Sequence, residues 1–171
     1  MNLENEIINT SNIMDIYEHC KCLLNNNINV LLFLDIDDTV LSSKHGEKFL
    51  DKNITKLVNI VYQYNPNNLF FLTARDYEYK KKTINQLNGA KLVHDNKYIH
   101  YNVIHSPYNY ENAMPIATKG NTLTKFITRF QQPSWIIFVD DAVEQIESVY
   151  NSLNNEPMSH FNYTLYHYIT K

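Results

Sequence analysis

The chain has 171 residues, of which 44% are hydrophobic, 13% are aromatic and 19% are charged. This composition excludes a disordered polar chain, because the apolar residues are numerous enough to form the core of a single domain spanning 1–171. The net charge of −3 excludes a general electrostatic attraction to nucleic acid or to an acidic membrane surface.

The first expected element is a helix over 11–24, where apolar residues recur at helical spacing and Ser11 can act as the N-cap. Residues 1–29 are therefore expected to form a helical segment that packs on the core. Cys20 and Cys22 lie one residue apart on this helix and cannot face each other, so no disulfide is expected between them.

The rest of the chain alternates between apolar strands and helices. The run VLLFL at 30–34 is apolar at every position, which is typical of a strand buried on both faces of a parallel sheet. This alternation predicts an α/β fold with a central parallel sheet. The later elements are expected to be a helix at 51–64, a strand at 69–72, a helix at 76–89, strand-like residues at 92–104, a loop at 106–118, a helix at 119–130, a strand at 135–139, a helix at 143–153 and a last strand at 161–169.

Polar side chains follow three of the expected buried strands. In a parallel sheet the carboxyl ends of the strands meet at one edge, and ligands bind there. Several acids at that edge repel one another unless a cation offsets their charge, and an oxygen-rich site of this kind suits Mg²⁺. The side chains are Asp35 and Asp37 after the first strand, Thr73 and Arg75 after the second, Asp140 and Asp141 after the third, and Lys119 at the start of a helix.

These residue types have complementary chemistry. A carboxylate can attack phosphorus and form an aspartyl phosphate. A second carboxylate can protonate the leaving oxygen and then activate water. The hydroxyl of Thr73 and the ammonium of Lys119 can hold phosphoryl oxygens and balance their charge.

The set resembles the haloacid dehalogenase superfamily, which is dominated by phosphatases. The resemblance covers roughly residues 30–150, with four motifs in the same order and at approximately the same spacing. The motifs are Asp35-Ile36-Asp37-Asp38-Thr39, Phe70-Phe71-Leu72-Thr73, Lys119-Gly120 and Phe138-Val139-Asp140-Asp141.

The resemblance implies a three-layer Rossmann-like fold with helices on both faces of the sheet. It implies that Asp35 is the nucleophile and a metal ligand, and that Asp37 is the general acid/base and binds the metal through its backbone carbonyl. Asp141 would bind the metal directly while Asp140 orients Lys119, although these two roles could be exchanged.

The candidate substrate-binding side chains are Thr39, Thr73, Arg75 and Lys119. Thr39 would begin a small flap over the site, and an ion pair is the alternative role for Arg75. Both intervals in which relatives insert a large cap domain are short here, so the site is expected to be open and suited to a bulky substrate.

The expected activity is therefore Mg²⁺-dependent hydrolysis of a phosphomonoester. One alternative is a phosphatase acting on 3′-phosphorylated polynucleotide ends, although the net charge of −3 does not favour nucleic acid. Another is a catalytically silent binding module with the same fold. The run Lys80-Lys81-Lys82 is expected to be a solvated helix face, with a phosphate-rich partner as the alternative.

A cytoplasmic location without a membrane partner is expected. No segment has the ~18 consecutive apolar residues of a membrane-spanning helix. Acids at Glu4 and Glu6 stand where a signal peptide carries basic residues. The identity of the phosphorylated substrate and the oligomeric state do not follow from the sequence.

Overall fold

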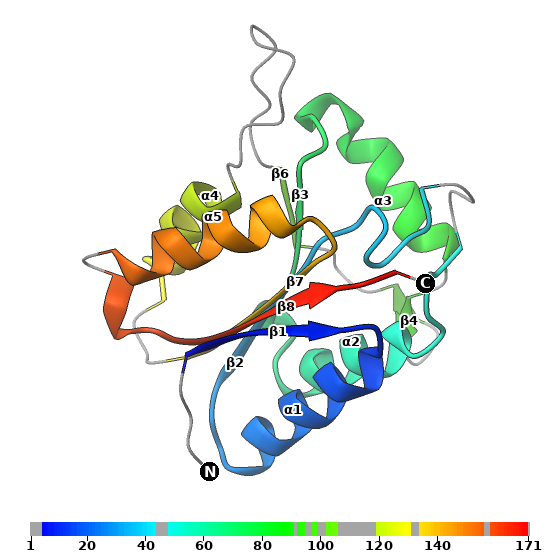
Figure 1. Ribbon diagram of the computed structural model, residues 1–171. Coiled ribbons are helices and arrows are strands. Elements are labelled where there is room, and N and C mark those ends of the chain that lie inside the picture. The colour runs from blue at the N-terminus through cyan, green and yellow to red at the C-terminus, as the bar shows by residue number, and fades with distance from the viewer. Residues whose placement is uncertain are drawn as a thin grey trace, which may run out of the picture.

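Strands and helices alternate along the chain in the computed structural model (Figure 1). The structure describes residues 5–43, 48–90, 92–94, 97–98, 102–105, 119–130, 134–155 and 158–170. The helices are α1 (Ile13–Asn25), α2 (Ile54–Tyr64), α3 (Lys80–Gly89), α4 (Lys119–Ile127) and α5 (Val143–Asn154). The strands are β1 (Glu6–Thr10), β2 (Val30–Leu34), β3 (Leu69–Thr73), β4 (Val93–His94), β5 (Lys97–Tyr98), β6 (Asn102–His105), β7 (Trp135–Asp140) and β8 (Asn162–Tyr168).

Six of the strands form one sheet in the order β1-β8-β7-β2-β3-β6, and every neighbouring pair is parallel. At the centre, Phe33 of β2 lies between Phe70 of β3 and Phe138 of β7. Strands β4 and β5 form a separate antiparallel pair. The predicted parallel α/β sheet is confirmed.

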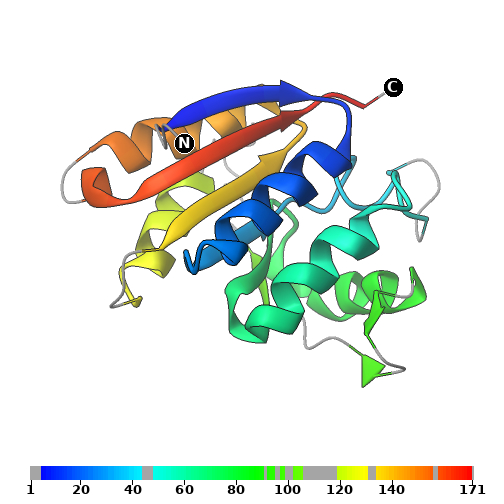
Figure 2. The same cartoon turned by 90° about the horizontal axis from the view of Figure 1, so that it is seen from below.

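Successive side chains of β2 enter two different cores. Val30, Leu32 and Leu34 join the core that α1 and α2 cover, whereas Leu31 and Phe33 join the core that α4 and α5 cover. Figures 1 and 2 show these helix pairs on opposite faces of the sheet. The three-layer Rossmann-like architecture is therefore confirmed, and it explains why the central strand β2 is apolar at every position.

The N-terminal segment differs from the helix-only prediction. Strand β1 precedes α1 and pairs with β8 from the other end of the chain. The N-cap of α1 is Asn12, whose side chain accepts a hydrogen bond from the Met14 N–H at 3.1 Å, and Ser11 is not the cap. The strand EIINT is mostly exposed at the sheet edge, so it lacks the continuous apolar run that identifies the central strands.

Three other expectations concern smaller features. The strand-like stretch at 92–104 contains the β4–β5 hairpin and most of β6, whereas the predicted loop at 106–118 lies outside the described residues. Within the described part of the chain, neither Cys20 nor Cys22 is in a disulfide. No described helix combines the length and the apolar composition required to cross a membrane.

Candidate functional site

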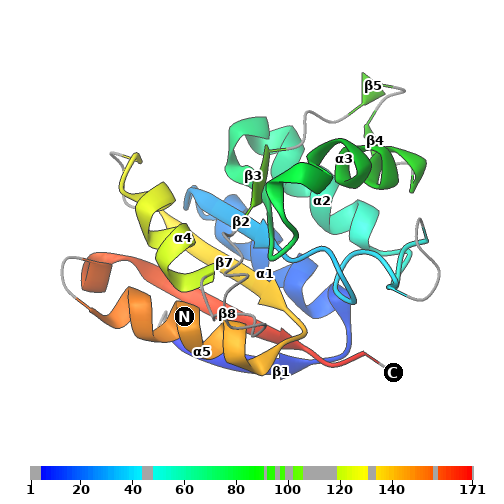
Figure 3. The same ribbon diagram turned by 90° about the horizontal axis from the view of Figure 1, so that it is seen from above.

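The candidate site lies where the strand order of the sheet reverses. From β2 the chain continues to β3 and β6 on one side, and it then returns to β7 and β8 on the other side. Figure 3 shows β3, β2, β7 and β8 side by side. Ligands of parallel α/β proteins bind outside the carboxyl ends of the strands at such a reversal.

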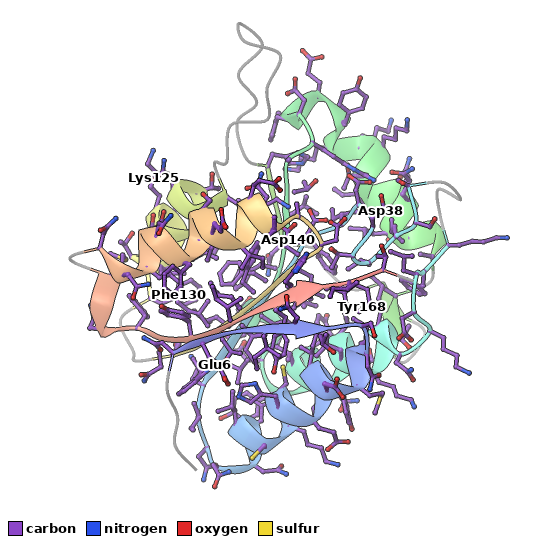
Figure 4. The ribbon with its side chains drawn as sticks, viewed as in Figure 1. Glu6, Asp38, Lys125, Phe130, Asp140 and Tyr168 are labelled. Carbon is purple, nitrogen blue, oxygen red and sulfur yellow. The ribbon has the colours of Figure 1, made fainter. Side chains whose placement is uncertain are left out.

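Three carboxylates meet at this reversal. The backbone N–H of Asp35 donates to the Val139 carbonyl at 2.9 Å, which continues the β2–β7 pairing and brings Asp35 beside Asp140. One oxygen from each of Asp35, Asp140 and Asp141 lies within 4.8 Å of the others. Asp35 and Asp140 are buried and Asp141 is half-buried. Figure 4 places Asp140 between the α4–α5 layer and α3.

Lys119 provides positive charge inside this cluster. Its ammonium donates to Asp35 Oδ1 and, at 2.7 Å, to Asp140 Oδ2, and its side chain is only 3% exposed. The other Asp140 oxygen accepts from the Ala142 N–H at 3.0 Å. Asp141 Oδ1 accepts a long hydrogen bond, 3.5 Å, from the Thr39 hydroxyl and makes no contact with the Lys119 ammonium among the ion pairs of the described residues. This geometry favours Asp140 as the residue that orients Lys119 and leaves Asp141 more available to a metal.

The carboxyl groups of the cluster resist ionisation. Burial and the nearby Asp35 charge raise the pKa of Asp140, Lys119 opposes them, and together these effects place the pKa at about 7. Burial and the Asp35 charge likewise raise the pKa of Asp141 to about 6. Burial also raises the pKa of Asp35 despite Lys119. When all three carboxyl groups are ionised, their negative charge exceeds what the one ammonium compensates.

The same charges act in the opposite direction on the lysine. Burial alone would lower the pKa of Lys119, but the Asp35 and Asp140 carboxylates outweigh that effect and raise the pKa. Lys119 consequently remains an ammonium at neutral pH.

Gly120 fixes the depth at which Lys119 enters the site. A Cβ atom on Gly120 would lie 2.2 Å from the Ser148 carbonyl oxygen and 2.4 Å from Ser152 Oγ, so only glycine lets α4 lie this close to α5. The Gln145 side chain, also on α5, accepts from the Lys119 N–H at 3.4 Å. The sequence reading gave neither Gly120 nor Gln145 a role, because only the helix packing reveals it.

Asp37 and Arg75 form a two-pronged ion pair at the rim of the site. Arg75 Nε donates to Asp37 Oδ2 at 2.8 Å, and Arg75 Nη2 donates to Asp37 Oδ1 at 2.5 Å. From α3, Thr83 Oγ1 at 3.1 Å and Gln86 Oε1 at 2.7 Å accept from Arg75 Nη1. The structure thus places Arg75 in the ion pair considered as its alternative role. The carboxylate of Asp37, 44% exposed, pairs with Arg75 and is not one of the three acids of the cluster.

Thr73 and Thr39 are both fully buried. Thr73 Oγ1 accepts from the Arg75 N–H at 3.1 Å, so its hydroxyl proton can still be donated to a ligand. The turn before Thr39 is made by Asp38, whose φ of 56° is left-handed and whose Oδ1 accepts from the Ser43 N–H at 2.9 Å. Part of the expected flap, residues 44–47, lies outside the described residues.

A family model described as "Protein of unknown function (DUF2608)" matches residues 45–171. The matched range includes Thr73, Lys119, Asp140 and Asp141, and it begins after Asp35. Neither the curated proteins nor the solved structures include a match to the chain.

Proposed function

The chain belongs to the family described as protein of unknown function (DUF2608), and because that description names no activity, we propose from the site that the protein is a Mg²⁺-dependent phosphomonoester hydrolase. The proposal includes the haloacid dehalogenase type of chemistry, with an aspartyl phosphate on Asp35. It also includes a cytoplasmic location.

The observation that carries the proposal is the charge of the cluster. When all three carboxyl groups are ionised, the cluster with its one ammonium has a net charge of −3 + 1 = −2. A divalent cation would neutralise that charge and would favour the ionised form of the acids. An all-oxygen donor set fits Mg²⁺ better than a soft metal. Asp35 and Asp141 would hold the ion, with the Asp37 backbone carbonyl as the third protein ligand that the family resemblance implies. When bound, Mg²⁺ would neutralise charge on the phosphoryl oxygens.

In the first half of the proposed reaction, a carboxylate oxygen of Asp35 attacks phosphorus and the bond between phosphorus and the ester oxygen breaks. Asp37 donates its proton to the departing oxygen. Lys119 neutralises charge beside Asp35, and the Thr73 hydroxyl donates to a phosphoryl oxygen. The products of this half are the alcohol and an aspartyl phosphate.

In the second half, Asp37 takes a proton from water and the resulting hydroxide attacks the phosphorus of the aspartyl phosphate. The bond between phosphorus and Asp35 breaks, which releases phosphate and restores the carboxylate. Arg75 holds the ionised Asp37 carboxylate at the rim through its two hydrogen bonds, which is the form that takes the proton from water; in the first half the protonated oxygen of Asp37 would bond to the departing oxygen in place of one of them.

The test is a panel of phosphomonoesters, including an aryl phosphate, assayed with Mg²⁺ and with a chelator. Wild-type turnover should require Mg²⁺, and Asp35→Asn should abolish it. Asp38→Asn is the matched control, because it removes the same charge from a turn residue outside the three-acid cluster; it should keep most of the activity.

Two results would count against the proposal. Hydrolysis by Asp35→Asn at the wild-type rate would exclude Asp35 as the nucleophile. Mg²⁺ binding by the wild-type protein without turnover of any ester would instead support the silent binding module.

A further inference from the structure

A surface beside the site carries aromatic and cationic side chains that the proposed chemistry does not use. We call it the tyrosine–lysine face, and it consists of Tyr77, Tyr79 and Lys80, Lys81 and Lys82. It is formed by the short 3₁₀ helix Tyr77–Tyr79 and the first turn of α3. Tyr77 is 66% exposed and Tyr79 is 52% exposed. Each tyrosine pairs with a lysine three residues later, with Lys80 Nζ 5.2 Å and Lys82 Nζ 5.9 Å from the respective ring centroids.

The tyrosine and lysine side chains of this face contribute little to the stability of the fold. Helix α3 is anchored in the protein by Thr83 and Leu87, which are its buried residues. Lysines in the first turn of a helix oppose the helix dipole. Within the described residues none of these lysines forms an ion pair. The contact between a lysine and an exposed aromatic ring is weak. The ammonium groups can therefore move from the rings to bind a phosphate.

The face is continuous with the rim of the site. The Tyr77 ring lies 5.6 Å from the His105 ring in an edge-to-face contact. His105 stands opposite Thr73 in the sheet, and its Nδ1 donates to the Arg75 carbonyl at 2.9 Å. Arg75 in turn holds Asp37. A chain of contacts through His105 and Arg75 therefore connects Tyr77 to the proposed general acid.

The surface beside Tyr77 is hollowed. An open depression of about 440 Å³ is lined by Tyr77, Glu78, Lys80, Lys81, Ile84 and Asn85. The depression can admit a flat ring beside the ammonium groups of Lys80 and Lys81. The negative charge of Glu78 disfavours a phosphate in the part of the depression that Glu78 lines. A ligand with alternating rings and phosphates matches this arrangement better than a compact sugar phosphate does.

We propose that the tyrosine–lysine face binds the nucleotides of a single-stranded oligonucleotide whose terminal phosphate is the substrate. Bases stack on exposed aromatic rings in single-strand-binding proteins, and lysines contact the phosphates between them. The inference rests on the proposed function for the terminal phosphate, but binding by the face does not depend on turnover. The positive segment acts locally, so it is compatible with a chain whose overall charge is −3.

Binding is measured in chelator, where no turnover is expected, by fluorescence anisotropy of a labelled 3′-phosphorylated oligonucleotide of about 12 nucleotides. Tyr77→Ala and, separately, Tyr79→Ala should each raise Kd about tenfold. The double variant Lys80→Ala/Lys82→Ala should reduce the slope of log K against log salt by about 1.4, or ~0.7 for each lost phosphate contact. Melting curves establish that each variant is folded.

The matched control is Lys52→Ala/Lys56→Ala. It removes two exposed lysines, of which Lys52 lies just before α2 and Lys56 lies in its first turn. It should leave both Kd and the salt slope at their wild-type values. An equal effect of the control and of Lys80→Ala/Lys82→Ala would overturn the inference, because binding would then follow net charge alone. Unchanged Kd values for both tyrosine variants, with inorganic polyphosphate competing as well as the oligonucleotide, would overturn it in favour of a general polyanion surface.

The two proposals fail in different ways. Turnover of an aryl phosphate without measurable oligonucleotide binding would overturn the inference and leave the phosphatase intact. Tyrosine-dependent oligonucleotide binding by a protein that hydrolyses no ester would support the inference and refute the phosphatase.

Discussion

The buried lysine of the cluster offers the sharpest test of the charge balance. Lys119→Met keeps most of the length of the side chain but removes the ammonium that contacts Asp35 and Asp140. Both carboxylates are then left buried without their cation. The change affects charge far more than packing, so its consequences should depend on pH and on metal.

The size of the effect follows from burial. The exposed fractions of the Lys119, Asp35 and Asp140 side chains are 3%, 7% and 1%, so water screens the interaction very little. Removing one partner of such a buried pair typically lowers the free energy of unfolding by about 3–5 kcal/mol. A domain is stable by only about 5–15 kcal/mol, so the variant should be close to unfolding in chelator near neutral pH.

The sign of the pH dependence follows from the carboxyl groups. Asp140 has a pKa raised to about 7 in the folded protein, from an ordinary value of 3.8. The folded state therefore binds more protons than the unfolded state between these values, and its stability falls as pH rises through them. Without Lys119 this penalty grows, so the variant should lose most stability near pH 8 and recover much of it near pH 5.

The measurement is urea unfolding of Lys119→Met and of Lys125→Met at about pH 5 and about pH 8. Lys125 is an exposed residue of the same helix, so its replacement should change stability by less than about 0.5 kcal/mol. Near pH 8 in chelator, equal stability of the two variants would refute the idea that Lys119 neutralises the cluster. A large defect of equal size at both pH values would identify lost packing as the cause.

Three further predictions address the support of the site. Gly120→Ala should lower the free energy of unfolding by roughly 1–3 kcal/mol, because its Cβ meets α5, and calorimetry should show a lower Tm. Mg²⁺ affinity, measured by isothermal titration calorimetry, should rise from about pH 5 to about pH 8, because the proposed ligand Asp141, with a pKa of about 6, must be ionised to bind the metal; ionisation of the neighbouring Asp140, with a pKa of about 7, adds negative charge beside it, and a flat profile would contradict this. Arg75→Lys should lower kcat up to about 10²-fold for alkyl phosphates, which need a protonated leaving group, and much less for aryl phosphates; equal losses would exclude a role through Asp37.

The central part of the fold could be predicted because burial on two faces imposes a simple pattern. Strand β2 is apolar at every position, and its polar neighbour Asp35 marks where the strand leaves the core. The same change from apolar to polar residues located Thr73 and Asp140. The carboxyl ends of parallel strands lie at one edge of the sheet. The three strand ends read from the sequence were therefore enough to predict that these residues lie close together.

Features that depend on a single close approach could not be predicted. The steric need for Gly120 comes from backbone and side-chain atoms of α5, which is distant in sequence. The ion pair between Arg75 and Asp37 depends on α3, where Thr83 and Gln86 hold the guanidinium. The prediction did not include strand β1, because this exposed edge strand lacks the continuous apolar run of a buried strand. Its partner in the sheet, β8, comes from the other end of the chain.

The location of Asp35 also bears on the extent of the functional unit. The family match covers 45–171, but β2 and Asp35 precede it. Strand β2 pairs with both β3 and β7, so without β2 the matched range would contain a sheet divided at its centre. The Asp35 N–H bond to Val139 and the Lys119 bond to Asp35 cross the same boundary. Strand β2 and Asp35 are therefore part of the same folded unit as the matched range, and any chemistry at the three-acid cluster requires both.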